Sequence, residues 1–262
     1  MTRPLLSDRG WADAKAALRR AAGRGRPVLV ALDFDGTITP IVSRPNRVRI
    51  PAETRRYLTR AAKKPGIRVA ALSARPMADL ARYLPGNGLL KVAQYGLEGA
   101  DAPEPAQLAR FRTGVRRLRP DIEALVSKHR GAWIEDKGLT IALHYRGVGA
   151  SHRAGLLRAA RRIEESARRI GFHTEPGRSV IDFVPARYDK GRALRALRRR
   201  VRPAVTFYFG DTAGDEPAFA ALGRADFAVR VGAGPTAAPY RVRGPGDVTR
   251  FLRALVALRM ND

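Results

Sequence analysis

The chain has 262 residues, 45% of them hydrophobic, and its 50 basic and 24 acidic side chains give a formal net charge of +26. It has no cysteine, which excludes disulfides and thiolate metal sites. The sequence shows no secretory signal and no apolar run of roughly 20 residues, so we expect a soluble, cytoplasmic protein that does not enter membranes. The arginines are spread along the chain at helical spacing, so we expect them to cover solvated faces and do not expect a nucleic-acid partner.

Strands and helices alternate in both the first and the last third of the chain. Strands are predicted at residues 27–34, 67–74, 89–96, 204–210 and 227–232. Helices are predicted at residues 51–66, 76–85, 189–200, 215–224 and 246–258. This alternation is typical of a parallel sheet covered by helices on both faces. The sequence therefore predicts an α/β fold with a Rossmann-like core formed by residues 1–102 and 187–262.

The pattern changes between residues 103 and 186. Two helical stretches occur there, together with the alternating segments "LTIALHYR" and "SVIDFV", which read as strands. The segments "DAPEPAQ" and "VPARYDK" are candidate hinges on either side. We therefore predict that residues 103–186 form a smaller α+β domain inserted into the core.

Two aspartates follow the apolar run of the first predicted strand, in "VLVALDFDGTITPIV" at residues 28–42. Alternate residues of a strand share a face, so Asp33 and Asp35 should point the same way while Phe34 points into the packing. Ligands of open parallel sheets bind at the carboxyl ends of the strands. Two close carboxylates call for a cation, and oxygen ligands suit Mg²⁺. The pair therefore predicts a metal site rather than the turn or helix cap that a lone aspartate usually forms.

The segment "LDFDGT" resembles the first motif of the haloacid dehalogenase-like hydrolases, most of which are phosphatases. The resemblance implies that Asp33 is the nucleophile and forms an aspartyl-phosphate. It also implies that Asp35 is the general acid for the leaving oxygen and then the base that activates water. An acid at position 35 favours a phosphatase or phosphomutase over the dehalogenases and ATPases of the superfamily.

Two further residues match this superfamily in order. Ser73 ends the second strand of the core, where the superfamily has a Ser or Thr that holds the phosphoryl group. Lys190 lies in the first turn of a predicted helix, where a cation opposes the helix macrodipole. The resemblance assigns Lys190 the neutralisation of Asp33 and of the phosphate; the alternative is a solvated surface lysine.

The segment "YFGDTAGDEPAF" carries two more carboxylates after an apolar run. Asp211 and Asp215 share a face if the turn is helical, and their mutual repulsion again calls for a cation. The resemblance makes Asp211 a Mg²⁺ ligand together with Asp33 and Asp35. It gives Asp215 the role of orienting Lys190 or the metal.

Most of the chain, from residue 28 to about residue 252, is similar to the trehalose-phosphatase family within this superfamily. The segments that carry the similarity are "DFDGTITPIV", "ALSARPMADL", "YGLEGA", "WIEDKGLTIALHYR", "TEPGRSVIDFVP", "DKGRAL" and "GDTAGDEPAF". The segment "EDKGLTIALHYR" is the most specific to this family. The resemblance implies that residues 103–186 form a substrate-specificity cap.

The resemblance also implies a set of substrate-binding residues. Glu135 and Lys137 lie on one face of a predicted strand, positioned to bind sugar hydroxyls, although a cross-strand salt bridge is the alternative. The family pattern P-G-K-x-x-x-E reads "PGRSVID" here, so Arg178 and Asp182 keep the charge but change the reach. Arg75, in "SAR" where "SGR" is usual, completes the set.

Some positions depart from the family or stand outside the reaction. Thr212 and Gly214 replace the usual Asp and Thr of "GDDxTDE", which bears on rate and specificity and not on the nucleophile. We expect His144 to pack or hydrogen-bond within its strand and not to act in catalysis.

The resemblance therefore implies a Mg²⁺-dependent phosphatase that releases trehalose and phosphate from trehalose 6-phosphate. One alternative is a phosphatase for another glycosyl or pseudodisaccharide phosphate; a phosphomutase would use the same nucleophile. An alternative of another class is a basic nucleic-acid-binding protein on an inactive phosphatase fold, against which the retained aspartates and Lys190 argue. The sequence does not decide whether a trehalose-phosphate synthase associates with the chain.

Overall fold

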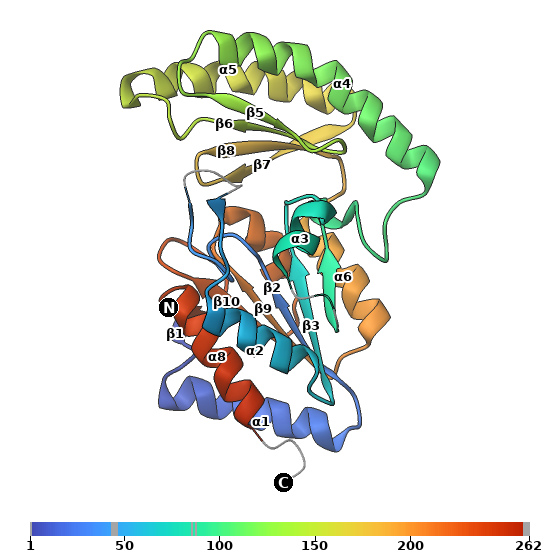
Figure 1. Ribbon diagram of the computed structural model, residues 1–262, viewed down its shortest axis with the longest axis vertical. Helices are drawn as coiled ribbons and strands as arrows, with labels where there is room; N and C mark the ends of the chain where they lie inside the picture. Colours follow the sequence, from blue (N-terminus) through green and yellow to red (C-terminus); the bar gives the residue numbers. More distant parts are fainter. Residues whose placement is uncertain (1, 43–46, 85, 87, 259–262) are drawn as a thin grey trace. The chain divides into compact units, whose positions relative to one another are not determined.

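The computed structural model describes residues 2–42, 47–84, 86 and 88–258, and the chain divides into two compact units (Figure 1). The first unit contains the chain up to Asp101, then Lys190–Asp211, and the chain from Asp215 onward. The second unit contains Ala102–Asp189 together with Thr212–Gly214. A parallel sheet with helices in one unit and a smaller antiparallel sheet in the other confirm the predicted α/β fold class.

The first unit is built on a parallel sheet. Its strands, in spatial order, are β1 (Arg3–Pro4), β11 (Tyr240–Val242), β10 (Phe227–Val231), β9 (Val205–Gly210), β2 (Val28–Leu32), β3 (Ile67–Leu72) and β4 (Leu89–Val92). Strand β2 lies between β9 and β3, and all five of its residues are buried. Both sides of β2 are therefore covered by packing, and its carboxyl end meets those of its neighbours at one edge of the sheet.

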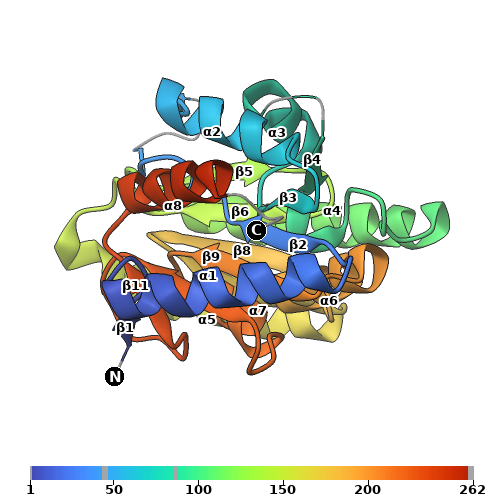
Figure 2. The ribbon, with the colours of Figure 1, turned by 90° about the horizontal axis from the view of Figure 1, so that it is seen from below.

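Helices cover both faces of this sheet. On one face, residues of α1 (Asp8–Gly23), α2 (Ala52–Ala62), α3 (Met77–Tyr83) and α8 (Pro245–Ala257) join Val28, Val30 and Leu32 in one apolar cluster. On the other, residues of α6 (Lys190–Val201) and α7 (Glu216–Ala220) join Leu29 and Ala31. The alternation along β2 follows the two-residue period of a strand. Helices α1 and α8 are neighbours (Figure 2), with the rings of Trp11 and Phe251 6.0 Å apart.

The second unit is an antiparallel sheet with helices α4 (Pro105–Ser127) and α5 (Ala150–Arg169). Its strand order is β5 (Trp133–Asp136), β6 (Ile141–His144), β8 (Val180–Pro185) and β7 (Phe172–Gly177). Ile141, Leu143 and Phe183 belong to the apolar cluster that includes residues of both helices. The side chains between them on β6 and β8, such as Ala142 and Asp182, point to the opposite face.

Some element boundaries differ from those predicted. The strand predicted at 27–34 ends at Leu32, and the strand predicted at 89–96 ends at Val92, where a short 3₁₀ turn (Gln94–Gly96) begins. Tyr95 in this turn has φ +60°, so the chain leaves the extended conformation there. The short strands β1 and β11, with two and three residues, carry too few residues for a periodic signal. No described helix combines the length and the apolar character needed to cross a membrane.

Candidate active site

Asp33 lies immediately beyond the end of β2, where the chain enters a tight loop. Its backbone N–H donates to the carbonyl of Phe209 (2.9 Å), so the pairing of β2 with β9 extends to this residue. The loop then closes on itself, since the Gly36 N–H donates to the carbonyl of Thr39 (2.9 Å). Gly36 has φ +83°, and a Cβ there would lie 2.2 Å from Oδ2 of Asp211. The loop after β2 therefore approaches Asp211 more closely than any other residue type would permit.

Three carboxylates converge beside this loop. Asp33, Asp211 and Asp215 are buried, and one oxygen of each lies within 4.8 Å of those of the other two. Asp211 follows β9 directly, which places it at the same edge of the sheet as Asp33. Hard cations such as Mg²⁺ are held by converging oxygen ligands. The three side chains therefore fit a site for such a cation.

Lys190, the first residue of α6, joins two of these carboxylates. Its Nζ donates to Oδ1 of Asp33 and to Oδ1 of Asp215, both at 2.7 Å, and the lysine is only 5% exposed. Burial lowers the pKa of Lys190, but the charges of Asp215 and Asp33 outweigh burial and raise its pKa above the usual value. Lys190 is therefore a permanent cation between the two acids.

The pKa of Asp33 lies well above its usual value. Burial is the largest cause, and the charges of Asp215 and Asp211 act in the same direction. Lys190 opposes the rise through its charge and its hydrogen bond. A cation bound among the carboxylates would favour the ionised form of Asp33 for the same electrostatic reason as Lys190 does.

Asp35 has a different environment from Asp33, although only Phe34 separates them. Phe34 is fully buried, as predicted from strand alternation. The Asp35 side chain is 42% exposed and is held by Arg75, whose Nε and Nη2 donate to its two oxygens at 2.6 and 2.8 Å. Arg75 also donates to Asp79 (3.1 Å). The resemblance implied Asp33, Asp35 and Asp211 as the metal ligands. Among the described residues, the carboxylate cluster consists of Asp33, Asp211 and Asp215.

Ser73 lies just beyond the end of β3, the neighbour of β2. It is buried, its Oγ accepts from the Arg75 N–H (3.2 Å), and its carbonyl accepts from Tyr95 (3.2 Å). The register that pairs Leu32 with Ala71 puts Ser73 at the same sheet edge as Asp33. The structure thus places Asp33, Ser73 and Asp211 just beyond the carboxyl ends of β2, β3 and β9, and Lys190 at the amino end of α6.

The second unit carries the other predicted binding residues. Lys137 donates to Oδ1 of Asp182 (2.5 Å), and both side chains are only 6% exposed. Glu135 pairs with Nε2 of His144 (2.8 Å) across β5 and β6. Glu135 on β5 and Lys137 in the turn after it, both predicted to bind substrate, are therefore each paired with a side chain of another strand of the sheet. Arg178 lies exposed in the turn between β7 and β8, four residues before Asp182.

Strand register explains why these residues share a face. Glu135 is opposite Ala142, Ala142 is opposite Asp182, and Asp182 is opposite Glu175. Directly opposite residues of neighbouring strands point to the same side. A row with three carboxylates therefore crosses the sheet on the face opposite the helices.

Two buried side chains near these sites were not predicted from the sequence: Tyr208 beside Asp215, and Glu175 in the row of carboxylates of the second unit. The Tyr208 hydroxyl donates to Oδ1 of Asp215 (2.7 Å), and burial and the nearby aspartates raise its pKa well above the usual value. Tyr208 stands in the apolar run "VTFYFG", where it reads as core. Glu175 is 9% exposed and hydrogen-bonds His173 (3.0 Å). In the sequence, Glu175 is marked only by its position two residues before Gly177, in the segment "TEPGR".

Comparisons with known proteins agree with this arrangement. The family model of the trehalose-phosphatases matches residues 31–245. A Mycobacterium tuberculosis protein described as an uncharacterized glycosyl hydrolase is 31% identical over 252 residues, which cover 88% of this chain and 18% of that protein. The trehalose-phosphate phosphatase of Mycobacterium ulcerans is 31% identical over 265 residues, 94% of this chain and 66% of that protein.

A solved structure described as a trehalose-6-phosphate phosphatase related protein superposes with a TM-score of 0.73 and is 26% identical, covering 87% of this chain and 96% of its own. The chain thus spans less than two thirds of the length of the two sequence relatives, and nearly all of the solved one. The matched segment contains the carboxylate cluster, Lys190 and the row of Glu135, Asp182 and Glu175 in the second unit. The chain therefore belongs to the trehalose-phosphatase family of phosphoric monoester hydrolases.

Proposed function

We propose that the chain hydrolyses trehalose 6-phosphate to trehalose and inorganic phosphate. The observation that carries the proposal is the buried cluster of Asp33, Asp211 and Asp215 bridged by Lys190. A phosphate monoester dianion is repelled by bare carboxylates, so a site with this many acids needs cations to admit it. Lys190 is one such cation.

In the proposed reaction, a carboxylate oxygen of Asp33 attacks phosphorus, and the bond from phosphorus to the sugar oxygen breaks. Asp35 gives its proton to the departing sugar oxygen. Asp35 then takes a proton from water, whose oxygen attacks the aspartyl-phosphate, releasing phosphate and restoring Asp33. The different surroundings of the two aspartates, one buried against Lys190 and one half-exposed on Arg75, support these different roles.

Mg²⁺ is the proposed metal, held by Asp33 and Asp211 with help from Asp35 or Asp215. When bound, it neutralises the phosphate charge and stabilises the transferring phosphoryl group. Lys190, whose Nζ donates to Oδ1 of Asp33, would contribute to the same neutralisation. Ser73, through its hydroxyl, is proposed to hold a phosphoryl oxygen.

The second unit, predicted from sequence as a domain of residues 103–186, is proposed to act as the cap that recognises the sugar. Its polar sheet face supports this role, because Glu135, Lys137 and Asp182 offer both donors and acceptors for hydroxyl groups. Arg178 is proposed to join them from the turn. The Lys137–Asp182 pair would have to share its hydrogen bonds with the substrate.

Phosphate release from a panel of sugar phosphates tests the proposal. With Mg²⁺, the chain should release phosphate from trehalose 6-phosphate in strong preference to sucrose 6-phosphate and glucose 6-phosphate. The Asp33→Asn variant should release none, and a chelator should stop the wild type until Mg²⁺ is restored.

Comparing one further variant, Lys137→Met, with Asp33→Asn separates the roles of the two units. Lys137→Met should raise KM for trehalose 6-phosphate and leave turnover of a small aryl phosphate unchanged, whereas Asp33→Asn should abolish both. Turnover of the aryl phosphate without any trehalose 6-phosphate activity would refute the proposed substrate. It would leave a phosphatase for another glycosyl phosphate, with Arg178 and Asp182 as the residues to examine.

A further inference from the structure

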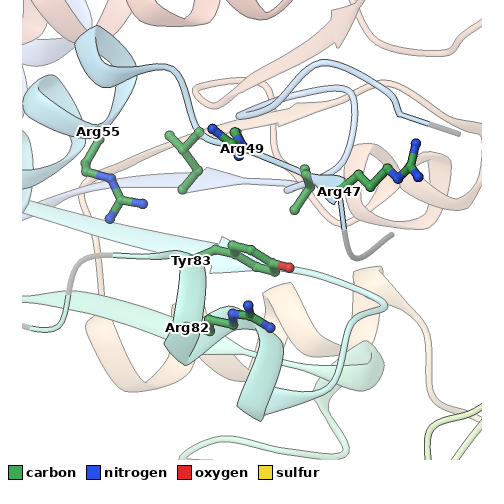
Figure 3. Close-up of a pocket in the computed structure, with 7 residues that line it drawn as sticks. Arg47, Arg49, Arg55, Arg82 and Tyr83 are labelled. Atoms are coloured by element: carbon green, nitrogen blue, oxygen red, sulfur yellow. The ribbon is translucent and has the colours of Figure 1, made fainter. Parts of the chain in front are cut away.

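The first unit contains a basic groove that the proposed reaction does not use. It has a volume of about 790 Å³ and is lined by Arg47, Val48, Arg49, Ile50, Arg55, Arg82 and Tyr83 (Figure 3). No aspartate of the candidate active site lines it. Its volume falls within the roughly 300–1,000 Å³ of small-molecule sites. We call it the arginine groove.

The charge of this groove is not neutralised from within. Its four arginines are exposed, and in the part of the chain that the structure describes none of them forms a salt bridge. The sequence has no acidic residue from 36 to 52 or from 80 to 97, the segments that supply three of the four. Glu53, the acid nearest to Arg55 in sequence, is bound by Arg253. Four like charges around one cavity repel one another, and an anion would relieve that repulsion.

The arrangement favours an extended anion over a single small one. Figure 3 shows Arg47 and Arg55 at opposite ends, Arg49 between them, and Arg82 along the other side. A guanidinium binds phosphate oxygens through two parallel hydrogen bonds, a geometry that lysine lacks. A ligand that engages all four arginines must therefore carry several phosphate oxygens along its length.

The remaining lining suits an organic portion of such a ligand. Val48 and Ile50 are apolar lining residues. Tyr83 presents its ring beside Arg82 (Figure 3). Aromatic and aliphatic walls with a few convergent polar groups are typical of small-molecule sites.

Tyr83 also connects this groove with a residue of the candidate active site. Its ring lies 6.0 Å from the ring of Phe34, and the guanidinium of Arg75 lies 5.7 Å from it. Arg75 is the residue that holds Asp35. We propose that the arginine groove is a separate binding site for a compound carrying two or more phosphate groups, with one wall packed against the side chain that positions Asp35.

Calorimetric titration of the full chain with inorganic triphosphate, in metal-free buffer, tests the proposal without relying on turnover. We expect stoichiometric binding that weakens with added salt. The Arg49→Glu/Arg82→Glu variant should weaken binding by about tenfold or more, because each arginine supplies charge-assisted hydrogen bonds. Arg224→Glu, an exposed arginine of the same unit outside the groove, is the matched control and should leave binding unchanged.

The Asp33→Asn variant distinguishes the arginine groove from the active site. It should bind triphosphate as the wild type does, although we expect it to have no phosphatase activity. Equal binding by the wild type and the groove variant would overturn the proposal. Retention of RNA without triphosphate binding would overturn it as well, in favour of a nucleic-acid surface. If the double glutamate variant does not fold, Arg49→Gln/Arg82→Gln carries the same test with less change in charge.

Discussion

At the residue scale, the site depends on how closely the loop after β2 approaches Asp211. Gly36 combines φ +83° with no room for a Cβ, since such an atom would lie 2.2 Å from Oδ2 of Asp211. Gly36→Ala therefore has to displace either the loop or the carboxylate. We predict a fall of about a hundredfold in kcat, the cost expected for a displacement of about 1 Å in an active site, together with weaker Mg²⁺ activation in a metal titration.

Gly25 provides the matched control for this residue. It has a similar φ of +62°, but a Cβ there meets nothing within 4 Å. Gly25→Ala should therefore show the backbone strain of a left-handed alanine, as a lower Tm, with kcat unchanged. Equal kcat values for Gly36→Ala and the wild type would show that Asp211 need not stay where the structure has it.

At the element scale, two glycines inside the helices of the second unit should respond oppositely to the same substitution. A Cβ at Gly114 of α4 would lie 2.2 Å from the ring of Phe172 on β7. Gly114→Ala should destabilise by about 1–3 kcal/mol, the range for overpacking a core. Gly155 of α5 has nothing within 4 Å, so Gly155→Ala should stabilise by about 0.5–1 kcal/mol through helix propensity.

Urea unfolding of the two variants and the wild type measures both changes. A stabilising Gly114→Ala would mean that α4 can move away from β7 without loss, contrary to the packing in the structure.

At the scale of the whole molecule, the net charge of +26 should itself limit stability. Like charges destabilise a compact chain through self-repulsion, and salt screens them: the Debye length falls from about 30 Å at 0.01 M to about 8 Å at 0.15 M. We predict that Tm rises over this range of sodium chloride. Replacing the exposed Arg158, Arg161 and Arg162 of α5 with glutamine should raise Tm at low salt and reduce the salt dependence. A Tm independent of salt in both proteins would contradict this prediction.

The sequence by itself determined the fold class of this protein and the family to which it belongs. Local patterns were sufficient because a buried parallel strand reads as a continuous apolar run, as in "VLVAL", and its carboxyl end marks where polar ligands gather. The motif "LDFDGT" then identified Asp33 and Asp35 as residues at such an edge. Both inferences rest on residues that are neighbours in the chain.

Only the tertiary structure decided which side chains meet. Lys190 reaches Asp33 across 157 positions, and Tyr208 joins Asp215 from inside an apolar strand. Asp33 and Asp35, equivalent by strand alternation, have separate surroundings because β2 ends at Leu32 and Arg75 approaches from another strand end. The polar row of Glu135, Asp182 and Glu175 likewise depends on register between strands. Such contacts depend on packing between distant segments, which local periodicity does not encode.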